Sequence, residues 1–263
     1  MGLSIAMKIN FPLLALAVGA FAIGTTEFSP MGFLPEIAND LSVSIPQAGL
    51  LISAYAVGVM IGAPLMTLWL ARFPKKTALI LLMAIFTIGN VLATVAPDYM
   101  SLMGARLITS LNHGAFFGLG SVVAASVVPK DKQASAVAMM FMGLTIANIG
   151  GVPLATWLSQ NTSWRMAFAA ISILGIMTML ALWKALPQDH DVVKLNVAKE
   201  LRVLTRAPVV LALLTTVMSA GAMFALYTYI APSLHVFMQA SPQTITLMLV
   251  LIGIGFSIGN HLG

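Results

Sequence analysis

Three ionisable side chains, Glu27, Arg106 and His113, stand inside long apolar stretches of this sequence. A charge in the hydrocarbon of a membrane costs roughly 2.5–3.5 kcal/mol on insertion scales, so such a residue faces inward, is paired or is neutralised. A carboxyl group can bind and release a proton, and an imidazole does so near neutral pH. The three residues therefore predict proton binding inside a membrane. The alternatives are a hydrated Glu27 near the surface and a neutral His113 hydrogen-bonded between helices.

The elements that must carry these side chains are membrane-spanning helices. Of the 263 residues, 59% are hydrophobic and 8% are charged, whereas about 25% are charged in a soluble domain. About 20 consecutive apolar residues span a bilayer as a helix, and prolines mark most breaks between such stretches. The sequence predicts an all-α polytopic membrane protein with eight spans, at residues 11–34, 47–70, 77–96, 99–128, 134–158, 166–186, 209–234 and 244–263.

Basic residues are concentrated in alternate loops. If the N-terminus lies inside the cell, the inner segments hold eleven of the 13 Lys and Arg residues, while Arg165 lies outside and Arg106 lies within a helix. The eleven are Lys8, Arg72, Lys75, Lys76, Lys130, Lys132, Lys184, Lys194, Lys199, Arg202 and Arg206. Because positive loops stay on the cytoplasmic side, we expect a cytoplasmic N-terminus.

This topology places Glu27 and Arg106 at the same depth. Each lies about seven residues from the outer end of its helix, which is roughly 10 Å at 1.5 Å per residue. We expect the two side chains to pair directly or to couple through water. The residues that share the face of Arg106 by i, i+4 and i+7 spacing are Ser110, His113, Phe117 and Ser121.

An internal repeat emerges when the chain is compared with itself. The stretch GVMIGAPL at 58–65 resembles GFSIGNHL at 255–262, an offset of 197 that also carries Pro35 onto Pro232. A parallel duplication of a six-helix unit explains both matches. A unit of this size implies a complete protein of roughly 390–400 residues.

The repeat predicts how the chain is divided into domains. Its one long polar loop, at 187–207, separates the two units. We expect an N-terminal six-helix bundle at 1–186, a cytoplasmic loop with an amphipathic surface helix at 193–204, and two helices of a second bundle at 208–263.

Several sequence blocks resemble the major facilitator superfamily, and within it the twelve-helix drug:proton antiporters of the arabinose-efflux and chloramphenicol-resistance type. The blocks are GTTEFSPMGFLPEIA at 24–38, ISAYAVG at 52–58, HGAFFG at 113–118, GGVP at 150–153 and SWR at 163–165. The resemblance covers the whole chain. It implies the major-facilitator fold, with a complete first bundle plus helices 7 and 8, and proton-coupled efflux of small drug-like or sugar-like compounds by alternating access. It also implies that two helices of a second bundle are too few for transport by this chain alone.

The resemblance further implies roles for individual residues. Glu27 would be the proton-coupling acid and Arg106 its partner, and His113 is a further candidate for proton coupling. The residues expected to line the substrate cavity are Thr26, Tyr55, Ser110, Thr145, Asn148, Met223 and Tyr227. Those expected in conformational motifs are Arg72, Lys75 and Lys76 after the second helix, and Gly150, Gly151 and Pro153 in the fifth.

The sequence departs from the family's pattern in places, and alternatives remain for some of these roles. The stretch TLWLARFPKK at 67–76 has Ala71 where the family's loop motif carries an aspartate, so its three basic residues have a purely topological role as an alternative. The match in the fifth helix is partial, with Val152 before the proline. For Thr145 and Asn148 two roles stay open, which are lining a cavity and hydrogen bonding to a neighbouring helix.

The sequence gives no indication of catalysis. It contains no H-E-x-x-H or Walker pattern, and no cysteine for a disulfide or a thiolate metal site. We therefore expect a transporter and not an enzyme, with no cofactor, no metal and no nucleic-acid partner. Its expected partners are membrane lipid, protons and a small-molecule substrate, and it is expected to work as a monomer in the bacterial inner membrane. A complete eight-helix membrane enzyme or channel of another class is the alternative.

Overall fold

A computed structural model describes residues 10–188 and 205–262. Over these ranges the chain forms helices and no strands, and eight helical stretches are long and apolar enough to cross a membrane. They are α1 (Phe11–Gly32), α3 (Ile45–Leu70), α4 (Lys75–Thr94), α5 with α6 (Tyr99–Ser110, His113–Ser126), α7 with η2 and α8 (Gln133–Ile146, Ala147–Gly151, Val152–Asn161), α9 (Trp164–Ala185), α11 (Ala207–Met238) and α12 (Pro242–Leu262). The short helices α2 (Leu34–Asp40) and η1 (Lys130–Lys132) lie in connections. The prediction of an all-α protein with eight spans is confirmed.

Capping side chains set where several of these helices begin. The side chains of Asn10, Ser44, Asp98 and Ser163 each accept a hydrogen bond from the backbone N–H three residues on, at the starts of α1, α3, α5 and α9. Such caps satisfy an N–H that the helix itself leaves free. The first span ends earlier than predicted, because Phe33 separates α1 from α2.

The span predicted at 99–128 is not one continuous helix. It breaks at Leu111 and Asn112, between α5 and α6. Just before the break, the hydroxyls of Thr109 and Ser110 donate hydrogen bonds to backbone carbonyls of the preceding turn, at 2.8 and 2.7 Å. Local bonds of this kind compete with the helical ladder. The face that was predicted along one helix is therefore divided between two.

The span predicted at 134–158 contains the π-helical turn η2. Pro153 lacks the N–H that would continue the ordinary ladder, and the N–H of Val152 bonds to the carbonyl of Ala147, five residues earlier. Single π turns inside α-helices occur frequently at functional sites. The proline predicted to bend this helix thus follows a widened turn.

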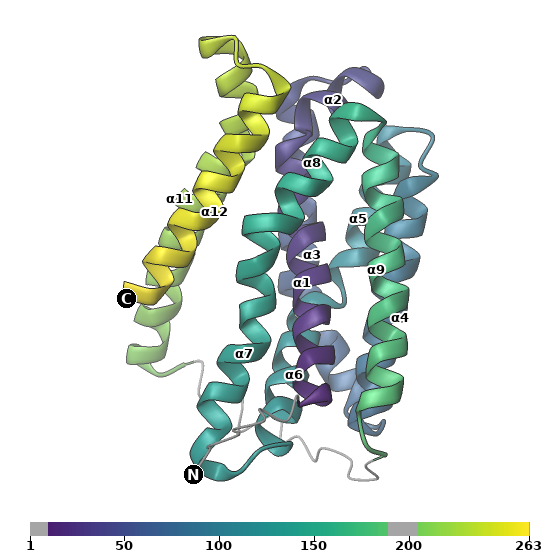
Figure 1. The fold of residues 1–263 in the computed structure, drawn as a ribbon, viewed down its shortest axis with the longest axis vertical. Helices are drawn as coiled ribbons and strands as arrows, with labels where there is room; N and C mark the ends of the chain where they lie inside the picture. The colour runs from purple at the N-terminus through teal and green to yellow at the C-terminus, as the bar shows by residue number, and fades with distance from the viewer. Residues whose placement is uncertain (1–9, 189–204, 263) are drawn as a thin grey trace, which may run out of the picture.

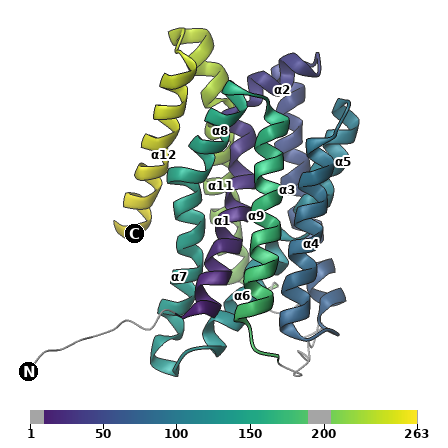
Figure 2. The same ribbon diagram turned by 45° about the vertical axis from the view of Figure 1, so that its right-hand side comes forward.

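The first six spans pack into one bundle around α1. Figure 2 shows α1 among α7, α9 and α11, and Leu16, Ala20 and Ile23 of α1 are fully buried. A continuous core joins α1 to α3–α9. The helix that carries Glu27 is therefore held on several sides.

The helices α11 and α12 lie beside this bundle and are joined to it at one end. We call the end with the α3–α4 loop and η1 the basic end, and the opposite end, where α2 lies, the α2 end (Figure 1). A second core connects α11 and α12 to α1, α2, α3 and α8 through Phe28, Leu34, Val152, Tyr227 and Leu249. Away from this core most residues of α11 are exposed, and in Figure 1 both helices diverge from α7 towards the basic end.

The helix boundaries agree with the proposed repeat. Shifted by 197, the stretch 11–40 of α1 and α2 falls on 208–237, and α11 is Ala207–Met238. Pro232, expected near the end of its helix, lies inside α11. The domain limits at 186 and 208 fall between α9 and α11 and stay a prediction, and the helix expected at 193–204 lies outside the described residues.

Candidate functional site

Glu27 lies on α1 beside a cavity between the bundle and α11. The cavity has a volume of about 530 Å³ and is lined by Glu27, Ser53, Tyr55, Phe224 and Tyr229, among others. We call it the acidic cavity, because the carboxyl-bearing Glu27 is part of its lining. The Oε2 atom of Glu27 lies 3.9 Å from Nε2 of His113, and both side chains are 14% exposed. The fold thus places His113, which is expected to take part in proton coupling, beside Glu27.

Arg106 points to α1 and to Tyr55. Its Nη1 donates a hydrogen bond to the carbonyl of Thr26 at 2.9 Å, and its guanidinium lies over the Tyr55 ring, 4.2 Å from the centroid. The direct ion pair predicted between Glu27 and Arg106 is not formed, because the guanidinium is turned towards these two groups. Coupling of the two through water stays a prediction.

Tyr55 and His113 complete a connected polar set. The Tyr55 hydroxyl lies 3.1 Å from Nδ1 of His113, so Glu27, His113, Tyr55 and Arg106 follow one another in contact. One ring nitrogen of His113 thus lies within hydrogen-bonding distance of a phenol, and the other lies within ion-pair distance of a carboxyl. These four residues form one connected polar cluster. It brings together all three predicted proton-coupling residues.

Two residues predicted in the substrate cavity are placed elsewhere. Thr26 is fully buried and donates its hydroxyl to Oδ1 of Asn90 on α4 at 2.7 Å. Ser110 is fully buried as well, and its hydroxyl lies where a side chain on Gly58 of α3 would be. Thr26 therefore bonds α1 to α4, whereas Ser110 donates within α5 and packs its hydroxyl against α3.

A second cavity lies on the other side of α1 and contains three residues predicted to line it. It has a volume of about 1060 Å³, and the described residues that line it are uncharged. We call it the neutral cavity; its lining includes Phe28, Phe141, Met142, Thr145, Asn148, Ser219, Met223, Phe256 and Ser257. Tyr227 lines a smaller cavity of about 320 Å³ that shares Met223 with it.

Residues that sequence reasoning did not assign to the site are Phe28, Phe224 and Asn90. The ring of Phe28 packs on Phe224 of α11 with centroids 5.3 Å apart. Phe28 and Phe224 look like ordinary apolar helix residues, so only the fold shows their contact. Asn90 is an amide in an apolar stretch, and that signal was present in the sequence.

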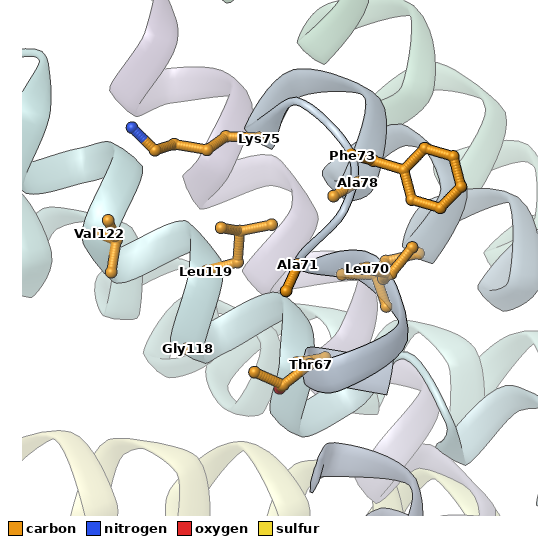
Figure 3. Close-up of a pocket in the computed structure, with 11 residues that line it drawn as sticks. Thr67, Leu70, Ala71, Phe73, Lys75, Ala78, Gly118, Leu119 and Val122 are labelled. Carbon is orange, nitrogen blue, oxygen red and sulfur yellow. The ribbon is translucent and has the colours of Figure 1, made fainter. Parts of the chain in front are cut away.

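The predicted motif after the second helix lies at the basic end. The guanidinium of Arg72 lies over the rings of Trp69 and Phe73 at 5.3 and 5.5 Å, and Lys76 Nζ donates to the carbonyl of Leu186 at 2.8 Å. Lys75 lines an apolar cavity of about 180 Å³ between α3, α4 and α6 (Figure 3). Their role in conformational change, or in topology alone, stays a prediction.

The glycines of the fifth span differ in what they contact. A side-chain carbon on Gly143 would meet the backbone of Ala17 and Phe21 in α1, and one on Gly151 would meet Thr25 and Phe21. Gly150 has no atom within 4 Å of that position. The prediction that these glycines let a neighbouring helix approach closely is therefore confirmed for Gly143 and Gly151, and it is wrong for Gly150.

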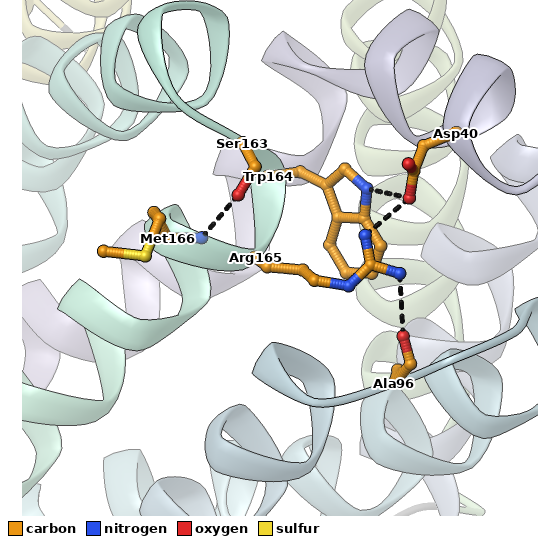
Figure 4. A network of polar contacts seen from close by, with 6 residues as sticks. All are labelled: Asp40, Ala96, Ser163, Trp164, Arg165 and Met166. Carbon is orange, nitrogen blue, oxygen red and sulfur yellow. Dashed lines mark hydrogen bonds and ion pairs between the residues drawn. The ribbon is translucent and has the colours of Figure 1, made fainter.

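A network of polar contacts lies at the α2 end of the bundle (Figure 4). Asp40 accepts hydrogen bonds from Nε1 of Trp164 at 3.0 Å and from Arg165 Nη1 at 2.5 Å, and Arg165 Nη2 donates to the carbonyl of Ala96 at 2.9 Å. The hydrogen bond from Arg165 contributes most, and that from Trp164 adds to it, in holding the pKa of Asp40 below its usual range. The network joins α2 to α9 and to the α4–α5 connection. In the described ranges, no three His, Asp or Glu side chains are grouped so as to hold a metal ion.

Almost the whole chain is similar in sequence to known proteins. A profile of the Major Facilitator Superfamily matches residues 16–263. The inner membrane transport protein YdhP of Escherichia coli (strain K12) is 67% identical over 257 residues, which cover 98% of this chain and 66% of the relative. The putative transporter AraJ of the same strain is 36% identical, covering 95% of this chain and 64% of the relative. The chloramphenicol resistance protein of Streptomyces lividans is 32% identical, with 94% and 64% covered. The chain spans just under two thirds of the length of these relatives.

A solved structure has the same arrangement of helices. It is a bacterial homolog to the human lysosomal transporter Spinster in an inward-facing and occupied conformation, with a TM-score of 0.75 and 19% identity. The match covers 95% of this chain and 60% of that chain. At this identity the likeness concerns the fold alone.

Proposed function

Because the chain belongs to the major facilitator superfamily, we propose that the protein is a proton-coupled exporter of small drug-like or sugar-like compounds. Membership confirms the expected major-facilitator fold of a multi-pass membrane protein, and the named relatives are transporters and not enzymes. The alternative of an eight-helix enzyme or channel is therefore set aside. The observation that carries the proposal is the position of Glu27, at 3.9 Å from His113 and on the wall of the acidic cavity.

Glu27 is the proton-coupling acid in this proposal. When it is ionised, its charge attracts a protonated His113 and, at longer range, Arg106, and such attraction is strong where water is scarce. A proton on Glu27 removes this attraction. The contact of α1 with α5 and α6 then loosens, so that protonation is linked to a change in helix packing.

The geometry also supports movement of the second unit against the first. The cores are closed at the α2 end, whereas the acidic and neutral cavities lie between α11, α12 and the bundle. Rocking of one bundle against the other around a central site is how such transporters alternate access. With the N-terminus in the cytoplasm, as the basic loops predict, the cavities would open inward.

Efflux from membrane vesicles tests the proposal. Full-length protein is placed in vesicles with an imposed proton gradient, and gradient-driven movement of chloramphenicol and of a sugar panel is measured. We expect Glu27→Gln to abolish gradient-driven transport, because the amide cannot bind and release a proton.

The control is Asp131→Asn, which removes the same charge at an exposed site on the basic end. It should transport at the wild-type rate. If Glu27→Gln also keeps the wild-type rate, Glu27 is not the coupling residue.

A further inference from the structure

Asn90 on α4 is a fully buried amide that bonds in two directions. Its Nδ2 donates a hydrogen bond to the carbonyl of Phe86, one turn earlier on α4, at 2.9 Å. Its Oδ1 accepts a hydrogen bond from the hydroxyl of Thr26 on α1 at 2.7 Å. A carbonyl can only accept, so the nitrogen of the amide must face Phe86 and its oxygen must face Thr26. The orientation of the amide is therefore fixed by its own helix.

This orientation leaves the hydroxyl of Thr26 as an acceptor. A hydroxyl has one proton, and here the proton is directed to Asn90, so only the lone pairs remain for a further bond. Nη1 of Arg106 donates to this hydroxyl at 3.4 Å and to the carbonyl of the same residue at 2.9 Å. The guanidinium thus bonds to two oxygens of one residue on α1, and that residue directly precedes Glu27 in the sequence.

The adjacent Thr25 shows the other bond that a threonine hydroxyl makes in this helix. It donates to the carbonyl of Phe21, four residues earlier, at 2.8 Å. Threonine hydroxyls in helices readily bond to the carbonyl three or four residues back. If Asn90 lost its amide, the hydroxyl of Thr26 would turn to its own helix in the same way. Its oxygen would then turn away from Arg106.

The position of Arg106 decides how readily Glu27 binds a proton. A cation within about 4–6 Å of a carboxylate favours the ionised form, so a direct ion pair would hold Glu27 ionised. In the structure the guanidinium instead lies over the Tyr55 ring, 4.2 Å from the centroid, and bonds to Thr26. The bond network from α4 thus affects the acid through the placement of one cation.

Other titratable groups also face Glu27. His113 of α6 lies 3.9 Å from its carboxyl, and Tyr55 of α3 and Tyr229 of α11 line the same cavity. They contribute to its proton affinity as well. The contribution of Asn90 is separated from theirs by variants that leave all three of these side chains in place.

We propose that Asn90 is a positioning residue for proton coupling. By fixing the hydroxyl of Thr26, it holds Arg106 against the backbone of α1 and away from the carboxyl of Glu27, which stays free to take up a proton. Loss of the amide would let the guanidinium move to Glu27. This inference rests on the proposed function and adds to it the residue that keeps the acid available.

Carbodiimide labelling tests this role without substrate or gradient. Dicyclohexylcarbodiimide enters membranes and reacts with protonated carboxyl groups. The full-length protein in proteoliposomes is labelled over a range of pH, and the adduct on the peptide that contains Glu27 is measured by mass spectrometry. Glu27→Gln serves as the blank. The pH of half-maximal labelling reports how readily Glu27 is protonated.

We expect Thr26→Val and Asn90→Leu each to lower the pH of half-maximal labelling by about one unit, because the released guanidinium comes within ion-pair reach of Glu27. Thr26→Ser keeps the hydroxyl and should keep the wild-type value. The matched control is Thr25→Val, which removes an adjacent buried hydroxyl that bonds only to its own helix among the printed contacts of the described chain. It should keep the wild-type value as well.

Arg106→Gln identifies the route of the effect. Adding Asn90→Leu to Arg106→Gln should give no further shift, because no guanidinium is left to move. A further shift would mean that Asn90 acts without Arg106, and it would overturn the proposal.

Three other results would also overturn it. They are an unchanged pH of half-maximal labelling in either Thr26→Val or Asn90→Leu, an equal shift in Thr25→Val, and a shift in Thr26→Ser as large as that in Thr26→Val. The labelling needs no transport. Its failure therefore leaves the transport result for Glu27→Gln standing, and a failure of proton-coupled transport leaves the labelling result standing.

Discussion

Among single residues, Arg106 has the most demanding surroundings. The residue is 1% exposed, and a buried charge is costly unless it is paired and hydrogen-bonded. The carbonyl of Thr26 and the ring of Tyr55 satisfy part of it, while Nε and Nη2 have no hydrogen-bond partner in the described part of the chain. A water between Arg106 and Glu27 would satisfy these donors, because buried waters bridge such groups.

We predict that Arg106→Lys lowers gradient-driven transport at least tenfold. An ammonium group cannot both stack on Tyr55 and reach the Thr26 carbonyl as the planar guanidinium does. A hydrogen bond from a charged group contributes about 1.5–3 kcal/mol. Initial efflux rates in vesicles, corrected for the amount of folded protein, measure the effect.

The charge-conserving control is Arg165→Lys at the α2 end. Arg165 is partly exposed, and exposed ion pairs contribute only about 0–1 kcal/mol. Its transport rate should therefore stay within about twofold of wild type. Equal losses in both variants would contradict a specific role for Arg106.

The composition of the site was predictable from sequence, but its contacts were not. Glu27, Arg106 and His113 stand out because ionisable residues are rare in apolar helices, and the fold brings all three together. Which of them touch depends on side-chain rotamers and on the break at Leu111 and Asn112. Residue spacing along one ideal helix predicts neither the side-chain rotamers nor the position of this break.

Among the helices, the fifth span has glycines in two different packing environments. A methyl group on Gly143 would collide with the backbone of α1, whereas one on Gly150 would enter open space. Backbone atoms cannot move aside as a flexible side chain can. The two positions lie in the same span, one on each side of the start of η2.

We predict that Gly143→Ala destabilises the protein by about 1–3 kcal/mol, the usual cost of overpacking. Gly150→Ala should leave the melting temperature in detergent unchanged. Thermal unfolding of the two purified variants, measured side by side, checks this. A larger loss for Gly150→Ala than for Gly143→Ala would contradict the packing of α7 on α1.

The helices themselves were largely predictable, and their irregularities were not. Length, hydropathy and prolines placed all eight spans. The π turn and the α5–α6 break arise from hydrogen bonds of particular hydroxyls and from a missing proline N–H. These effects change a few backbone bonds without changing the apolar pattern, so hydropathy does not register them.

For the whole molecule, the two units meet at the α2 end and separate towards the basic end. Thr246 of α12 donates its hydroxyl to Gln160 of α8 at 3.1 Å, at the α2 end. Ala138 of α7 and Gly259 of α12 line the neutral cavity. The first pair reports closure at the α2 end, and the second reports closure towards the basic end.

We predict that a Gln160→Cys/Thr246→Cys variant of the full-length protein is readily joined by a short bifunctional maleimide, because the two native side chains are in hydrogen-bond contact. An Ala138→Cys/Gly259→Cys variant should cross-link poorly in the same state, since the neutral cavity lies between its two sites. Alternating access requires the two yields to change in opposite directions when a proton gradient and chloramphenicol are applied together. The two cross-linking yields are measured from the mobility of the protein on a gel. If both pairs cross-link equally and neither responds, the two units do not rock about the neutral cavity.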